Sequence, residues 1–174
     1  MPFISYAQNL EDVILWRVLS RIKTGFYIDV GAFSPNVDSV TKAFYVAGWS
    51  GVNIEPNPVY HGELEVFRPN DVNLCFAIGE KEDFVIMNFI ENTGLSTLDG
   101  KIANKHLSDG HKLEKKEVRV KTLSSVWEGY VGDNRDVHFL KIDIEGYEEA
   151  AIRGNDWERF RPWVVVVEAT FPDR

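Results

Sequence analysis

Three acidic residues, Asp29, Glu55 and Asp143, stand at or just past the ends of apolar segments that read as buried strands, and Glu168 is a fourth candidate. In an open parallel sheet, ligands bind at the edge where the carboxyl ends of the strands meet. A carboxylate at that edge costs desolvation free energy unless it meets a hydrogen-bond donor or a cation. These residues therefore favour a ligand that is rich in hydroxyl groups or positive charge.

The first of these strands ends in the turn Asp29-Val30-Gly31-Ala32, where Gly31 lets the backbone approach a ligand that a Cβ would hit. Glu55 follows 24 residues after Gly31, a spacing that suits a carboxylate bound to both hydroxyls of a ribose. Residues 32–36 contain no further glycine, which counts against the pyrophosphate of NAD or FAD. A nucleoside without phosphates tolerates this turn. A packing glycine in an ordinary strand turn is the alternative interpretation.

Four carboxylates, Asp29, Asp143, Glu145 and Glu168, could supply oxygen ligands for magnesium. They show no compact ligand spacing along the chain, so we predict no metal site.

The elements that must position these residues alternate between helix and strand. Apolar spacing predicts a helix over residues 9–22, capped by Asn9 and buried through Leu10, Val13, Ile14 and Val18. A second helix is expected to begin at Ser34 and end at Gly48. Further helices are predicted over 59–67 and 147–152, and strands over 26–31, 52–55, 74–78, 139–143 and 163–168.

A helix between the first two strands makes a βαβ unit with a parallel strand pair. The four consecutive valines of residues 164–167 predict a central strand that is buried on both faces. We therefore predict an α/β, Rossmann-like fold with a mostly parallel central sheet and helices on both faces.

An insertion over residues 84–120 separates the two halves of this pattern. Its extended segments, 84–90 and 117–120, are consistent with an antiparallel pair, and residues 91–116 form a long polar loop. Loops of that length are uncommon unless they are functional, so we expect this one to cover the cleft and help form an acceptor pocket. His106 and His111 lie in the loop, where a solvated histidine is the simpler interpretation than a catalytic base.

The bulk properties exclude several classes of protein. A length of 174 residues predicts one compact domain, and a net charge of −8 disfavours nucleic acid as a partner. The single cysteine, Cys75, excludes an intramolecular disulfide and fits a reducing compartment. Early acidic residues argue against a signal peptide, and no apolar run approaches the length of a membrane span. We expect a cytoplasmic protein without membrane insertion; its oligomeric state is not predicted.

Five segments, in this order and spacing, resemble the FkbM family of S-adenosylmethionine-dependent methyltransferases. They are Tyr6-Ala7-Gln8-Asn9-Leu10-Glu11-Asp12, Tyr27-Ile28-Asp29-Val30-Gly31-Ala32, Asn53-Ile54-Glu55-Pro56-Asn57-Pro58, Gly94-Leu95-Ser96-Thr97-Leu98 and Leu140-Lys141-Ile142-Asp143-Ile144-Glu145-Gly146-Tyr147-Glu148. The resemblance implies a class I methyltransferase fold. It also implies O-methylation, at a hydroxyl of a sugar or natural product. It implies one methyltransferase domain over residues 1–174, with a cofactor-binding half at 26–79 and a second half at 137–174.

The resemblance also implies roles for individual residues. The turn with Asp29, Gly31 and Ala32 would hold the methionine part of S-adenosylmethionine, and Glu55 would bind the ribose. The adenine would be flanked by residues Asn57, Ala77 and Ile78. Asp143 and Glu145 would face the methionine end and the acceptor, a small molecule or glycan. Asp143 is the first candidate for a general base and Glu145 the second, although Asp143 could equally bind the methionine ammonium.

The chain departs from the family pattern in two places. Pro35 and Asn36 stand where a further glycine is common, and the two final strands of the class I fold are not expected after residue 168. Two other functions remain open. One is a non-catalytic module that kept the fold and binds a nucleoside or a protein partner. The other is a dinucleotide oxidoreductase, which the missing glycines disfavour.

Overall fold

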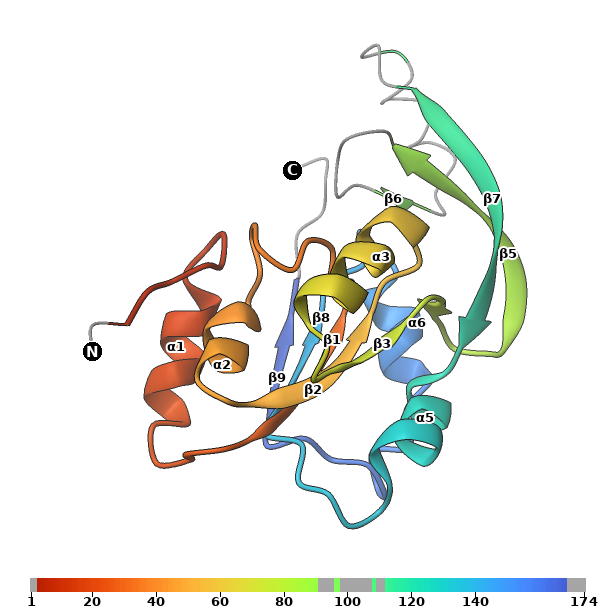
Figure 1. The fold of residues 1–174 in the computed structure, drawn as a ribbon. Helices are drawn as coiled ribbons and strands as arrows, with labels where there is room; N and C mark the ends of the chain where they lie inside the picture. Colours follow the sequence, from red (N-terminus) through yellow and green to blue (C-terminus); the bar gives the residue numbers. More distant parts are fainter. Residues whose placement is uncertain (1–2, 91–95, 98–107, 109–111, 169–174) are drawn as a thin grey trace.

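A computed structural model describes residues 3–90, 96–97, 108 and 112–168. Its main sheet has the order β3-β2-β1-β8-β9, and every neighbouring pair is parallel (Figure 1). The strands are β1 (Phe26–Val30), β2 (Ser50–Ile54), β3 (Val72–Leu74), β8 (Phe139–Ile142) and β9 (Val164–Val167). The predicted parallel sheet is confirmed.

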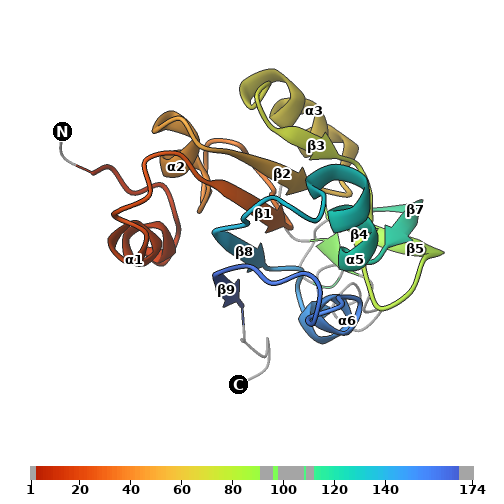
Figure 2. The same ribbon diagram turned by 90° about the horizontal axis from the view of Figure 1, so that it is seen from below.

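Helices cover both faces of this sheet (Figure 2). One face carries α1 (Glu11–Val18), α2 (Lys42–Val46) and α3 (Pro58–Phe67). The other carries α5 (Leu123–Val126), the π-helical turn η1 (Trp127–Val131) and α6 (Glu148–Arg153). The α/β, Rossmann-like fold predicted from the sequence is therefore the observed one.

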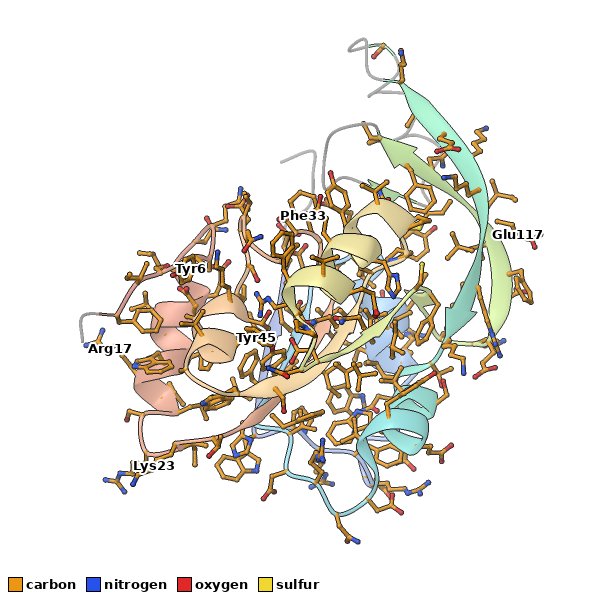
Figure 3. All side chains as sticks on the ribbon, viewed as in Figure 1. Tyr6, Arg17, Lys23, Phe33, Tyr45 and Glu117 are labelled. Atoms are coloured by element: carbon orange, nitrogen blue, oxygen red, sulfur yellow. The ribbon has the colours of Figure 1, made fainter. Side chains whose placement is uncertain are left out.

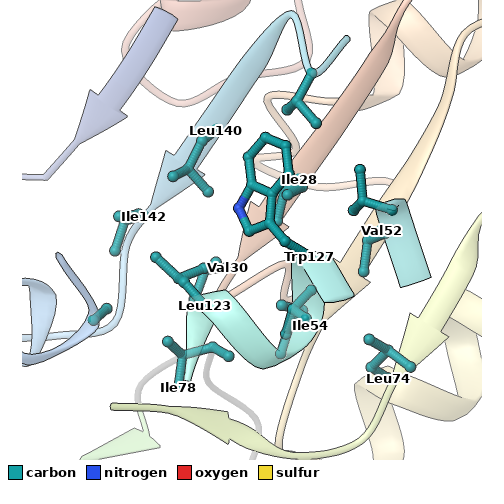
Figure 4. Close-up of a cluster of buried hydrophobic side chains, with 14 of the residues drawn as sticks. Ile28, Val30, Val52, Ile54, Leu74, Ile78, Leu123, Trp127, Leu140 and Ile142 are labelled. Atoms are coloured by element: carbon teal, nitrogen blue, oxygen red, sulfur yellow. The ribbon is translucent and has the colours of Figure 1, made fainter. Parts of the chain in front are cut away.

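The core follows the alternation of side chains along the strands. Ile28 and Val30 of β1 point to one face, where Trp127 and Leu123 cover them (Figure 4). Tyr27 points to the other face and packs in a second cluster with residues of α1 and α2. The strands β1 and β8 are thus buried on both faces, which fixes the positions of the residues that follow them.

A second sheet of order β4-β7-β5-β6 forms beside the first. Its strands are β4 (Ala77–Ile78), β5 (Asp83–Ile90), β6 (Ser96–Thr97) and β7 (Leu113–Lys121). β5 and β7 form a long curved antiparallel hairpin that extends beyond the main sheet (Figure 1). The predicted antiparallel pair is confirmed; β5 begins one residue before the predicted 84–90, and β7 is longer at both ends than 117–120.

The predicted helix over residues 9–22 is wrong in its bounds and in its buried face. It begins after Leu10, which has a left-handed φ of 64°, and Asn9 does not cap it. Leu15 and Leu19 are buried, whereas three of the four residues predicted to be buried, Leu10, Ile14 and Val18, are 57%, 63% and 64% exposed. The buried face of the helix carries a charged residue, Asp12, beside Leu15 and Leu19. Because the sequence analysis looked only for apolar residues at helical spacing, it selected the exposed face instead.

The second predicted helix and one predicted strand are also corrected. Helix α2 begins at Lys42, because the Ser34 hydroxyl accepts the N–H groups of Asn36 and Val37 and so forms a separate turn. The predicted strand 74–78 is divided between β3 and β4, which belong to different sheets. Strand β9 lies at the edge of the main sheet with Val165 39% exposed, so its four valines do not mark a central strand.

Candidate active site

A cavity of about 320 Å³ opens at the carboxyl ends of β1, β2, β8 and β9. Five of the predicted site residues line it: Gly31, Ala32, Glu55, Asp143 and Glu145. Figure 3 labels Phe33, another lining residue, at this edge of the sheet beside α3. The volume lies within the range of roughly 300–1,000 Å³ that is typical of small-molecule sites.

A narrow apolar recess of about 20 Å³ adjoins this cavity. Ala77 and Ile78, predicted to flank a base, line the recess, and Gly31, Pro56 and Met87 belong to both spaces. Met87 comes from β5, so the hairpin contributes a wall to the site. Because methionine is unbranched and flexible, its side chain can move to admit a flat ring.

Two predicted cofactor-binding residues, Asp29 and Asn57, are not among the described residues that line either space. Asp29 is 1% exposed and accepts a hydrogen bond from the Thr41 hydroxyl at 3.0 Å. The Asn57 side chain caps α3 by accepting the N–H of Val59 at 3.0 Å. In this structure both residues hydrogen-bond to the segments that form the walls of the site and do not line the cavity themselves.

Glu55 is a buried carboxylate at the end of β2, only 6% exposed. One of its oxygens accepts the N–H of Phe33 at 2.9 Å and the other accepts the N–H of Asn57 at 2.8 Å. Burial raises the pKa of Glu55 to about 7, although these two hydrogen bonds lower it. Each oxygen keeps a second lone pair, so the side chain can still accept hydroxyl protons of a ligand.

The turn after β1 does not offer a phosphate site. The N–H groups of Gly31 and Ala32 both donate to the Ile54 carbonyl, at 3.0 and 3.1 Å. Helix α2 begins eleven residues after Gly31, so this turn does not lead directly into a helix. Dinucleotide pyrophosphates bind where these two features coincide.

Gly31 is required by backbone packing, which was the alternative interpretation of this glycine. Its φ is +76°, and a Cβ at this position would collide with the carbonyl oxygen of Asp143. The close approach that excludes a side chain is therefore made by the chain after β8. This contact holds Asp143 directly beside the first turn.

Lys141 is a site residue that the sequence analysis missed. Its ammonium nitrogen lies 2.7 Å from the Gly31 carbonyl oxygen and 3.3 Å from a carboxylate oxygen of each of Asp29 and Asp143. Although burial alone would lower the pKa of Lys141, these two carboxylates raise it. A lysine in a buried strand, two residues before a strand-end aspartate, was the available signal.

The turn after β8 directs two carboxylates toward the cavity. Glu145 has a φ of 54° and Gly146 a φ of 96°. The Glu148 carboxylate stabilises this tight turn by accepting the N–H groups of Ile144 at 3.0 Å and of Gly146 at 3.1 Å. Burial raises the pKa of Glu145, and the negative charges of Asp143 and Glu148 raise it further.

Carboxylate oxygens of Asp143, Glu145 and Glu168 lie within 4.8 Å of one another. The structure therefore brings together three of the four carboxylates that we considered as magnesium ligands. Acidic groups of this kind are common without a bound ion, so this grouping alone does not assign a metal.

The N-terminal segment supplies a wall that was also missed. Gln8, Asn9 and Glu11 line the cavity. The fully buried carboxylate of Asp12 holds the segment in place, because it accepts the Ser5 hydroxyl at 2.7 Å and the N–H groups of Tyr6 and Ala7 at 2.7 and 3.3 Å. The motif at residues 6–12 thus has a structural basis in Asp12.

The predicted polar loop falls mostly outside the described residues, as do His106 and His111. Residues 113–116, which we assigned to this loop, belong to β7. In the part of the chain that the structure describes, the insertion reaches the cavity through Met87.

Residues 29–174 match a family model described as the methyltransferase FkbM domain. No curated protein and no solved structure matches the chain. Across the described residues, no helix has the length and apolar character needed to cross a membrane. The family match begins at Asp29, so Gln8, Asn9 and Glu11 lie outside it although they line the same cavity.

Proposed function

The chain belongs to the FkbM methyltransferase family, and from this premise we propose that it transfers the methyl group of S-adenosylmethionine to a hydroxyl oxygen of a small-molecule or glycan acceptor. The observation that carries the proposal is that three features lie in adjoining spaces: the apolar recess, the buried carboxylate of Glu55, and the acidic residues Asp143 and Glu145. S-adenosylmethionine has three matching parts: a flat base, a ribose with two hydroxyls, and a cationic methionine end.

The residues fit these parts in order. Ala77, Ile78 and Met87 would contact the adenine in the apolar recess. Glu55 would accept the ribose hydroxyls through its remaining lone pairs. Asp143, 39% exposed in its side chain, would face the methionine end. A dinucleotide fits less well, because the N–H groups of the first turn already donate to the protein.

S-adenosylmethionine supplies a methyl group that is already activated, so the protein mainly has to align the acceptor oxygen with it. The raised pKa of Glu145 suits a base that takes the hydroxyl proton. Asp143 is ion-paired with Lys141 and suits orientation of the donor or acceptor. Polar groups of Gln8, Asn9 and Glu11 at the cavity wall are suited to hydrogen bonding with acceptor hydroxyls.

Titration calorimetry with S-adenosylmethionine, S-adenosylhomocysteine and NAD tests the donor. We expect both adenosyl ligands to bind and NAD not to bind. Methyl-labelled donor incubated with a panel of sugars and hydroxylated natural products then tests the reaction, with labelled product and S-adenosylhomocysteine formed together. NAD binding alone would contradict the proposal, and binding of the donor without turnover on any acceptor would favour a non-catalytic module.

A further inference from the structure

Lys141 is a buried cation in the wall of the cavity that methyl transfer from a sulfonium does not itself require. The residue is 7% exposed, on a strand that is buried along its whole length. Moving a charge out of water is costly unless the surroundings return the lost interactions. Three oxygen atoms around the ammonium group, from Asp29, Gly31 and Asp143, replace the interactions with water.

These three oxygens belong to two parts of the chain, β1 with the turn after it and the segment after β8. Asp29 is within β1, Gly31 is in the turn after it, and Asp143 follows β8. In the sheet register, Asp29 and Lys141 are direct partners on adjacent strands. An ammonium group has three protons, so one side chain can bind all three oxygens and connect the two segments.

We propose that Lys141 is a positioning residue that fixes the Gly31 turn and the Asp143 carboxylate together for binding the methionine end of the methyl donor. This inference rests on the proposed function. Lys141 is not a base in this scheme, because its neighbouring carboxylates keep it protonated near neutral pH.

Loss of the ammonium group would affect its two carboxylate partners differently. Asp29 is 1% exposed and keeps its hydrogen bond from Thr41, so it would stay in place with a buried charge that has lost its cation, and the fold would be less stable. The Asp143 side chain is 39% exposed, so it can turn toward water once its cation is gone. A methionine at position 141 would keep much of the buried volume, and so the core, while it removes the charge.

A double-mutant cycle on S-adenosylhomocysteine affinity tests this coupling. We expect Lys141→Met and Asp143→Asn each to weaken binding by about 10- to 100-fold, the scale for hydrogen bonds to charged groups. The double variant should bind within about threefold of the weaker single variant. Lys141→Arg, which keeps the charge, should recover part of the affinity. The control is Lys23→Met, an exposed lysine at the opposite end of the molecule from Phe33 (Figure 3).

A merely structural Lys141 would lower the melting temperature without changing the affinity of the folded protein, and that result would overturn the inference. Fully additive effects of the two substitutions would overturn it as well. If Lys141→Met does not fold, the cycle is run with Lys141→Arg, whose smaller loss of affinity should likewise not add to that of Asp143→Asn. Failure of the wild-type chain to bind S-adenosylhomocysteine would instead contradict the proposed function.

Discussion

The Glu55 carboxylate accepts a hydrogen bond from the backbone N–H of Phe33 at 2.9 Å, and this contact ties the end of β2 to the turn after β1. The other Glu55 oxygen binds the N–H of Asn57, at the start of α3. One buried side chain therefore shapes two walls of the cavity. Its charge is expected to affect the stability of the free protein and, under the proposed function, its affinity for a ribose.

Glu55→Ala should weaken binding of S-adenosylhomocysteine by about 1–3 kcal/mol, because charge-assisted hydrogen bonds to the ribose are lost. The change is measured by titration calorimetry at pH 8, where the wild-type carboxylate is ionised. Glu158→Ala, at an exposed glutamate, is the matched control. Unchanged affinity in a folded Glu55→Ala protein would show that this carboxylate does not contact the ligand.

The raised pKa of Glu55 predicts a dependence of stability on pH. Because the folded state holds this proton more tightly than the unfolded chain does, stability is lost as the pH rises from about 4.5 through about 7. Ionisation of Glu55 in the folded protein should cost about 3 kcal/mol by pH 8. Urea unfolding at pH 5.5 and pH 8 should show about 2 kcal/mol of this loss, because the rest occurs below pH 5.5. The difference between the two pH values should be smaller in Glu55→Ala. Equal differences in both proteins would assign the effect to other groups.

The same ionisation should favour the ligand. A carboxylate accepts ribose hydroxyl protons better than a carboxylic acid does, so affinity for S-adenosylhomocysteine should rise between pH 6 and pH 8. With a pKa of about 7, the ionised fraction of Glu55, and with it the affinity, increases up to about tenfold over that range. Calorimetry across the range checks this, and Glu55→Ala should show a flatter profile.

Much of the site could be predicted because strand ends share one edge of a parallel sheet. Gly31, Glu55 and Asp143 each follow a strand that the apolar pattern identified, so topology alone brings them together. Glu145 follows Asp143 in the same turn. The pattern was specific here because β1, β2 and β8 are continuous buried strands.

The remaining site residues depend on contacts that sequence spacing does not encode. Met87 reaches the cavity only because β5 pairs with β7 and packs beside the main sheet. Gln8 does so because Asp12 holds the N-terminal segment, whereas the apolar spacing over residues 9–22 gave Asp12 no role. Asn57 was placed near the adenine, whereas its local hydrogen bond makes it a helix cap. Long-range packing decided the first case, and local hydrogen bonds decided the other two.

Met87→Trp should fill the apolar recess and lower S-adenosylhomocysteine affinity at least about tenfold, because the larger side chain occupies the space proposed for the adenine. Ile86→Trp is the matched control. Ile86 is the preceding residue on β5 and is 57% exposed, so its side chain does not face the cavity. Equal affinity of the two variants would place the adenine elsewhere.

We expect Asp143 to orient the donor and Glu145 to act as the base. Replacing each carboxylate by its isosteric amide distinguishes these two roles. Glu145→Gln removes the proposed base, so turnover should fall by about 10²–10⁴ while affinity for S-adenosylhomocysteine changes little. Asp143→Asn removes the partner of Lys141, so affinity should fall and turnover at saturating donor should largely persist.

The measurements are binding by calorimetry and single-turnover methyl transfer to whichever acceptor the labelled-donor panel identifies. Glu145→Gln should also remove the acidic limb of the pH–rate profile, because a base must be deprotonated to act. The opposite pattern, with turnover lost in Asp143→Asn at normal affinity, would make Asp143 the base, since it lies next to the same turn. Normal turnover in both variants would exclude general-base catalysis by either residue and leave alignment of the acceptor as the source of the rate.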